Sequence, residues 1–194
     1  MTKLSHLACA ALLYVAAMSA QESALAVDTS RSRVEFTLGD VLHTVHGRFT
    51  MKRGTLWFDA ATGKASGEIV VDASSGVSGN SARDRRMHKD VLESARYPEI
   101  TFRPDRVEGR LAPQGISGAR IRGVLSIHGA DHDITAPAQV DAADGQYKVS
   151  AHFDVPYTKW GMKNPSTLFL RVSDRVDIAV EMVFRPAAEA SQRQ

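Results

Sequence analysis

Apolar and polar residues alternate along most of the chain, and this alternation restricts the fold more than any other feature of the sequence. A clear run occupies residues 147–155, where every second side chain is nonpolar: Tyr147, Val149, Ala151, Phe153 and Val155. In a β-strand, side chains two positions apart lie on the same face of the sheet. The alternation therefore predicts strands with one dry face and one solvated face.

Comparable runs recur between residues 34 and 184, and short turn-forming segments that all contain Gly separate them, at residues 61–63, 112–115, 129–131 and 143–145. Loops this short join antiparallel neighbours. We predict about eight strands in one all-β domain without an internal repeat. A closed up-and-down barrel is favoured over a sandwich, because closure leaves no exposed edge strand. An eight-stranded barrel has room for a small ligand.

Residues 80–93 depart from the alternation and are predicted to form one short helix. They contain neither Gly nor Pro, and Ser81 followed by Asp84 matches a capping box at the helix start. Three apolar residues would form the inner face of this helix: Met87, Val91 and Leu92.

The same segment carries the one concentrated charge of the chain, a basic run made of Arg83, Arg85, Arg86, His88 and Lys89. In a helix these side chains spread over the outer surface and form a solvated face. The alternative is a collar at the barrel mouth that meets an anionic headgroup or a membrane surface.

The composition excludes several classes of protein. Lys and Arg number 24 against 22 Asp and Glu, with the two signs interspersed, whereas nucleic-acid-binding proteins gather Lys and Arg on one face. The single Cys excludes a disulfide framework and any zinc site built from several thiolates of one chain. With 43% hydrophobic residues, the chain is predicted to be globular and stabilised by burial of a core.

The first 26 residues have the three-part layout of a secretory signal peptide. Lys3 precedes an uncharged apolar run over residues 7–18, and small residues ending in Ala24-Leu25-Ala26 follow it. The run is too short to span a bilayer, which needs about 20 apolar residues. We predict a periplasmic or secreted protein, with cleavage after Ala26 and with Ala20 as the alternative site.

Two further boundaries follow from this prediction. The barrel would occupy residues 27–185, and residues 186–194, rich in Ala, Gln and charge, would form a disordered tail.

The sequence offers no strong catalytic constellation. It has neither a Gly-x-Ser-x-Gly nucleophile elbow nor a Gly-rich phosphate loop. Histidines are the candidate metal ligands, with His43 and His46 three positions apart and His128 and His132 beside a predicted turn. Residues three apart in a strand point to opposite faces, so the first pair shares a metal only in a turn or a helix. Surface or hydrogen-bonding roles are therefore favoured, and no metal site or catalytic residue is predicted.

Four motifs occur in an order that resembles one known family. The segment from Ser81 to His88, followed by Tyr97-Pro98-Glu99-Ile100-Thr101-Phe102, is similar to the Arg-Asp…His helix and Tyr-Pro-x-Ile-x-Phe strand of the YceI-like family, whose members resemble lipocalins. Val45-His46-Gly47-Arg48-Phe49 is similar to its early Val-x-Gly-x-Phe hairpin. Gly123-Val124-Leu125-Ser126-Ile127-His128-Gly129 is similar to its Gly-x-Leu-x-Ile-x-Gly strand. The resemblance runs from about Val27 to Phe184.

The resemblance implies a lipocalin-like antiparallel eight-stranded barrel with one short helix. It also implies an interior that holds an amphiphile with a long apolar tail, such as a polyisoprenoid or a prenylated quinone, and no cofactor beyond this ligand. The residues that the alternation directs inward are predicted to line the cavity: Phe36, Leu38, Phe49, Phe58, Ile69, Val71, Phe102, Leu125, Ile127, Phe153 and Val155.

Five polar or amphipathic residues are predicted to steer the headgroup at the mouth: Arg83, His88, Lys159, Trp160 and Lys163. Trp160 stands between the two lysines, and an amphipathic ring beside cations suits a barrel mouth near a headgroup or a membrane interface. The alternative for Trp160 is a plug that packs on the barrel end.

We therefore predict a binding or carrier protein, not an enzyme, that sequesters a long-chain isoprenoid or a prenylated quinone and has no nucleic-acid partner. Transient membrane contact and a homodimer are compatible with this interpretation. Two alternatives stay open from the residues alone. One is a histidine-based metal-binding protein or hydrolase. The other is a barrel filled by its own aromatic side chains that acts through its surface as a stress-related interaction partner.

Overall fold

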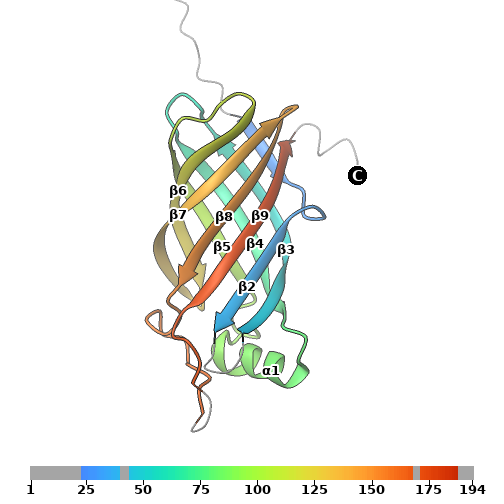
Figure 1. Ribbon diagram of the computed structural model, residues 1–194, viewed down its shortest axis with the longest axis vertical. Coiled ribbons are helices and arrows are strands. Elements are labelled where there is room, and N and C mark those ends of the chain that lie inside the picture. The colour runs from blue at the N-terminus through green and yellow to red at the C-terminus, as the bar shows by residue number, and fades with distance from the viewer. Residues whose placement is uncertain (1–22, 40–43, 168–170, 188–194) are drawn as a thin grey trace, which may run out of the picture.

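The computed structural model describes residues 23–39, 44–167 and 171–187, which form nine strands and one helical segment (Figure 1). The strands are β1 (Ser23–Val27), β2 (Arg33–Gly39), β3 (Thr44–Phe58), β4 (Ala65–Val77), β5 (Glu99–Glu108), β6 (Gly115–Ile127), β7 (Ala130–Ala143), β8 (Gln146–Val155) and β9 (Val176–Pro186). The helical segment is α1 (Ser81–Arg86), continued by one π-helical turn, η1 (Met87–Val91).

The strands form one closed antiparallel barrel. From β2 to β9 each strand pairs with the next one along the chain, and β9 pairs back with β2. The short β1 pairs with β3 and β9, the same two neighbours that β2 has further along the barrel. Because β1 and β2 share one position, the barrel has eight positions. The predicted eight-stranded, all-β, up-and-down barrel with one short helix is confirmed.

The early hairpin shows how one glycine shapes the interior. Gly47 on β3 pairs with Phe36 on β2, and a Cβ atom at Gly47 would lie 2.2 Å from Cζ of the Phe36 ring. Because glycine has no Cβ, the ring can lie over β3, where it meets the ring of Phe49 at a centroid distance of 5.3 Å. The Val-x-Gly-x-Phe pattern therefore builds part of the inner aromatic wall.

The turn between β6 and β7 is tighter than predicted. His128 and Gly129 both have positive φ, 53° and 76°, as a two-residue hairpin turn requires. The turn predicted at residues 129–131 lies instead at His128 and Gly129, because β7 begins at Ala130, and His132 on this strand pairs with Leu125 on β6.

The predicted helix lies between β4 and β5, but its cap differs from the prediction. The side chain of Asn80, not that of Ser81, accepts hydrogen bonds from the backbone N–H groups of Ala82 (3.1 Å) and Arg83 (3.0 Å). Both residue types are good caps, so the pattern alone could not choose between them. Within the described part of the chain, no helix is long and apolar enough to cross a membrane.

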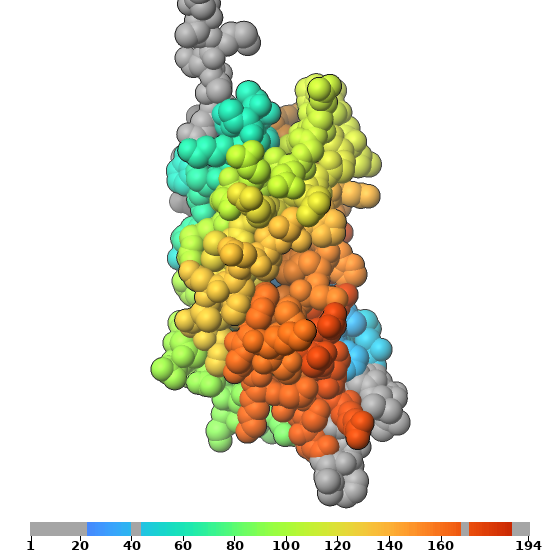
Figure 2. Space-filling view, turned by 90° about the vertical axis from the view of Figure 1, so that its left-hand side faces the viewer, coloured from blue at the N-terminus to red at the C-terminus, as the bar shows by residue number. Residues whose placement is uncertain are grey.

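The two ends of the barrel differ. The helical segment and the loop after β8 lie at one end, here called the helical end, which is the lower end in Figures 1 and 2. The β3–β4, β5–β6 and β7–β8 hairpins form the other end, here called the hairpin end. Figure 2 shows an elongated body between these two ends.

Part of the predicted signal peptide lies inside the barrel wall. Residues 1–22 lie outside the described residues, but Ser23–Val27 form β1, and Leu25 on this strand is buried in the core. Leu25 pairs with Leu56 on β3 and Pro186 on β9. Cleavage after Ala26 would remove four of the five residues of this strand.

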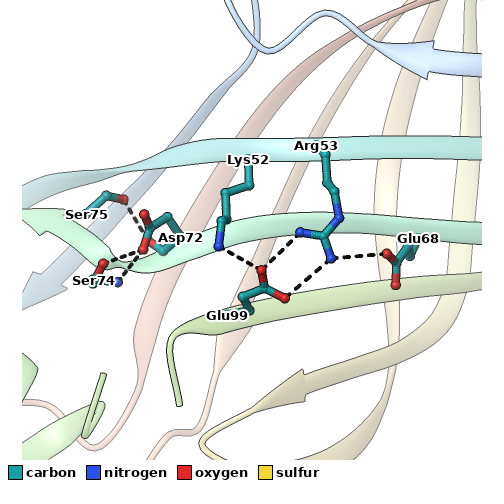
Figure 3. A network of polar contacts seen from close by, with 7 residues as sticks. All are labelled: Lys52, Arg53, Glu68, Asp72, Ser74, Ser75 and Glu99. Atoms are coloured by element: carbon teal, nitrogen blue, oxygen red, sulfur yellow. Dashed lines mark hydrogen bonds and ion pairs between the residues drawn. The ribbon is translucent and has the colours of Figure 1, made fainter. Parts of the chain in front are cut away.

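A network of ion pairs between side chains on the outer surface joins β3, β4 and β5 (Figure 3). Glu99 accepts a hydrogen bond from Lys52 Nζ at 2.8 Å and one from Arg53 Nη1 at 3.0 Å, while Nη2 of Arg53 lies 3.4 Å from Glu68. The hydrogen bonds from Arg53 and Lys52 lower the pKa of the Glu99 carboxyl to about 2. The network lies where the β3–β4 register shifts between Met51 and Arg53, so it links strands at an irregular place in the wall.

We expect Glu99→Gln to lower stability at neutral pH but not in acid. The folded-state pKa of Glu99 lies below the ordinary value of about 4.3, so its contribution is present above that value and is lost as pH falls toward 2. For a solvent-exposed network, we expect the melting temperature at pH 6 to fall by about 2 °C. Thermal unfolding at pH 6 and pH 2 measures the effect. Glu35→Gln, at an exposed position of β2, is the control. An equal loss at both pH values would contradict the ionic origin.

Candidate ligand-binding cavity

The barrel encloses a cavity of about 620 Å³ that extends along its length. Proteins bind small molecules in cavities of about 300–1,000 Å³. At the hairpin end the lining includes Trp57, which is 41% exposed, and Leu111. At the helical end it includes Ala82 and Met87 of the helical segment. The cavity therefore suits an elongated molecule.

All eleven residues predicted from the alternation line the cavity: Phe36, Leu38, Phe49, Phe58, Ile69, Val71, Phe102, Leu125, Ile127, Phe153 and Val155. Their contact with a ligand stays a prediction. They line it because the barrel pleat directs every second side chain inward. The predicted inner face of the helix, formed by Met87, Val91 and Leu92, also lines the cavity.

Small side chains keep the middle of the cavity open. Ala151 on β8 lines the cavity and pairs with Ala138 on β7 and with Val180 on β9. Ala136, two positions from Ala138, is also in the lining. Larger side chains at these positions would project into the space between the two ends.

The loop after β8 closes part of the helical end. Tyr157 and Met162 are buried, and both line the cavity. The Tyr157 hydroxyl donates a 2.6 Å hydrogen bond to the backbone carbonyl of Ser173, which ties the start of the loop to its end. Burial, together with the nearby Asp174 carboxylate, raises the pKa of Tyr157 to about 12, so the hydroxyl keeps the proton that it donates.

Of the five residues predicted at the mouth, only Arg83 lines the cavity. His88 lies outside the lining and connects the helical segment to its surroundings, with Nε2 2.8 Å from the Gly76 carbonyl oxygen and Nδ1 3.1 Å from Ser94 Oγ.

The other three predicted mouth residues belong to the loop after β8. Trp160 stacks flat on His132 of β7, with ring centroids 4.0 Å apart and planes 5° apart. Lys159 and Lys163 are exposed. None of the three is in the cavity lining, and Trp160 fixes the loop to the barrel wall instead.

One charged cavity residue, Arg86, belongs to the basic run for which a collar at the mouth was the alternative, but it was not among the five predicted headgroup residues. Arg86 lines the helical end of the cavity together with Arg83 and Ser78. The signal was available, because residues three apart on a helix lie on the same face, and Arg86 follows Arg83 by three positions.

The histidines have separate surroundings. His46 Nδ1 lies 3.1 Å from Thr37 Oγ1, and His128 Nε2 lies 3.2 Å from Glu93 Oε1. His43 lies outside the described residues. Among the residues that the structure describes, no three or more His, Cys, Asp or Glu side chains form a group that could hold a metal ion.

Comparison with known proteins identifies similar chains. The family model of the YceI-like domain matches residues 25–184 of the chain. BcnA of Burkholderia cenocepacia has a similar structure, with 19% identity, 81% of this chain and 98% of that chain covered, and a TM-score of 0.66. No curated protein sequence matches the chain.

Two further solved structures have the same fold. A polyisoprenoid-binding domain from Saccharophagus degradans, implicated in plant cell wall breakdown, has 14% identity and a TM-score of 0.66, with 84% of this chain and 99% of that chain covered. The YceI protein of Campylobacter jejuni has 18% identity and a TM-score of 0.59, with 73% of this chain and 85% of that chain covered.

Proposed function

Because the chain belongs to the YceI-like family and its barrel encloses a long apolar cavity, we propose that it binds and carries a prenyl-chain amphiphile. The ligand class is a polyisoprenoid or a prenylated quinone whose tail lies along the barrel. The similar domain from Saccharophagus degradans, which is a polyisoprenoid-binding domain, supports this class. In this proposal the protein acts by binding alone and catalyses no reaction.

The observation that carries the proposal is the cavity lining. Almost all of the lining side chains are apolar, and the charged ones are confined to the helical end. Each methylene group moved from water into such a lining gains about 0.8 kcal/mol, so ten buried groups supply about 8 kcal/mol. This is equivalent to a Kd of about 1 μM before the cost of ordering the tail is subtracted. Tail burial is therefore large enough to drive binding.

Export is the second part of the proposal. We propose a periplasmic or secreted protein, on the grounds of the three-part layout of residues 1–26. A carrier there would shield a prenyl tail from water between membranes. Cell fractionation with an antibody tests this part, and recovery of the protein only from the cytoplasm would contradict it.

The test of binding is extraction of the protein purified from its own host. We expect an organic extract to contain a prenyl lipid in about one copy per protein, measured by mass spectrometry. Native mass spectrometry should show the same added mass. A lipid-free extract, together with no uptake of prenols or prenylquinones offered in excess, would contradict the proposal. Stoichiometric metal in protein purified without a histidine tag would favour the metal-binding alternative instead.

A further inference from the structure

The charge of the cavity lining is one-sided. Among the described residues that line it, only Arg83 and Arg86 carry a charge, and both are cationic. Both lie on α1, at the helical end. No carboxylate in the described lining compensates for them.

Arg83 is held in place but keeps donors for a ligand. Its Nε donates to Ser78 Oγ at 2.7 Å, and its Nη2 donates to the Ser78 carbonyl oxygen at 3.1 Å. Ser78 is fixed in turn by Asp84, which accepts from the Ser78 backbone N–H at 2.9 Å and from its hydroxyl. A guanidinium has five N–H donors, and the hydrogen bonds within the described part of the chain leave Nη1 of Arg83 available for another acceptor.

The Arg86 side chain has no hydrogen-bond or ion-pair partner among the residues that the structure describes. Asp90 follows it by four positions, a spacing at which ion pairs form on helices, but the described contacts contain no pair between these two residues. Asp84, the other acidic residue nearby, is engaged by Ser78. Arg86 is exposed to solvent and also lines the cavity, so its guanidinium can reach an anion at the helical end.

We propose that Arg83 and Arg86 bind a phosphate headgroup, so that the ligand is a prenyl phosphate and not a neutral quinone or alcohol. This inference rests on the proposed function. Two guanidinium groups match the charge of about −1.5 to −2 on a phosphate monoester, and each can donate parallel hydrogen bonds to its oxygens. The tail then extends from the helical end toward Trp57 at the hairpin end. Both arginines are exposed and hydrated, so a neutral headgroup would form no charge-assisted hydrogen bond with them to offset the loss of that water.

Geranylgeranyl monophosphate and geranylgeraniol test the proposal, because they share one tail and differ only in the headgroup. Binding of each to the lipid-free protein is measured by titration calorimetry. We expect the phosphate to bind at least about tenfold more tightly than the alcohol. In Arg86→Gln the preference for the phosphate over the alcohol should fall by about tenfold. Arg85→Gln is the matched control, because Arg85 is on the same helix but not in the cavity lining.

Each other outcome overturns a defined part of the scheme. Equal binding of the two compounds would refute the phosphate site but leave tail binding intact. Binding of neither compound would refute the proposed function as well. An equal loss in the Arg85→Gln and Arg86→Gln variants would replace the site with a general attraction to the basic helix. Inorganic phosphate alone should compete weakly, and competition as strong as that of the prenyl phosphate would identify a free phosphate site instead.

Discussion

Replacement of Ala151 by tryptophan should weaken binding of a prenyl tail at least about 100-fold without unfolding the barrel. Ala151 lines the middle of the cavity and lies on β8 between Ala138 and Val180, so an indole at this position would fill the space between the two ends. A tail that can no longer pass the middle loses contact with about half of the lining. Loss of four to six buried methylene groups corresponds to about 3–5 kcal/mol, which weakens binding by a factor of about 100 or more.

The stability of Ala151→Trp distinguishes blockage from damage. Filling an apolar void supplies contacts that a cavity lacks, so we expect the melting temperature to stay within about 3 °C of the original protein. Ala151→Leu should give an intermediate loss of binding. Ala179→Trp is the control, because Ala179 is the exposed neighbour of Val180 on β9. Unchanged prenol binding in Ala151→Trp, measured by calorimetry, would place the tail outside the barrel.

The inner wall could be predicted from sequence because each strand has one dry face. On the adjacent strands β8 and β9, inward-facing residues are register partners of one another, as Val149 is of Met182 and Phe153 is of Ile178. Alternation specifies these positions whatever the partner strand is, so the lining of the cavity follows from the pattern. Short turns at the β3–β4, β5–β6, β6–β7 and β7–β8 connections then predict antiparallel neighbours.

The helical end could not be predicted in the same way, because its contacts join different elements of the structure. Trp160 has an amphipathic ring between two lysines, which is typical of a membrane interface, but in the structure it stacks on His132. His88 was predicted at the mouth, but its ring nitrogens lie within hydrogen-bond distance of the Gly76 carbonyl oxygen and the Ser94 hydroxyl instead. Such contacts depend on tertiary placement, about which local composition carries no information.

The first strand was missed for a different reason. Ser23-Ala24-Leu25-Ala26 consists of small and apolar residues, which suit both the end of a signal peptide and the edge of a packed strand. The sequence pattern favoured cleavage after Ala26. Pairing with β3 and β9 gives the same residues a place in the barrel.

A chain that begins at Val27 should therefore be much less stable than one that begins at Gln21. The shorter chain lacks Leu25, which is 7% exposed in the core, together with its backbone pairing to β3 and β9. Loss of one buried leucine costs about 2–5 kcal/mol, and unpaired strand groups add to this. For a domain of this size we expect the melting temperature to fall by about 10 °C. Thermal unfolding of the two purified chains, followed by circular dichroism, measures the difference.

Two further measurements connect this stability to processing in the cell. In the longer chain, Leu25→Ala should reproduce a large part of the loss of stability, whereas Ser23→Ala, at an exposed position of β1, should not.

We propose that the signal peptide is cleaved after Ala20, since a protease that cut after Ala26 would remove residues on which the closed barrel depends. The intact mass of the exported protein should then correspond to a chain starting at Gln21. A mass starting at Val27, with the melting temperature of the longer chain, would show that β9 and β3 close the barrel without β1.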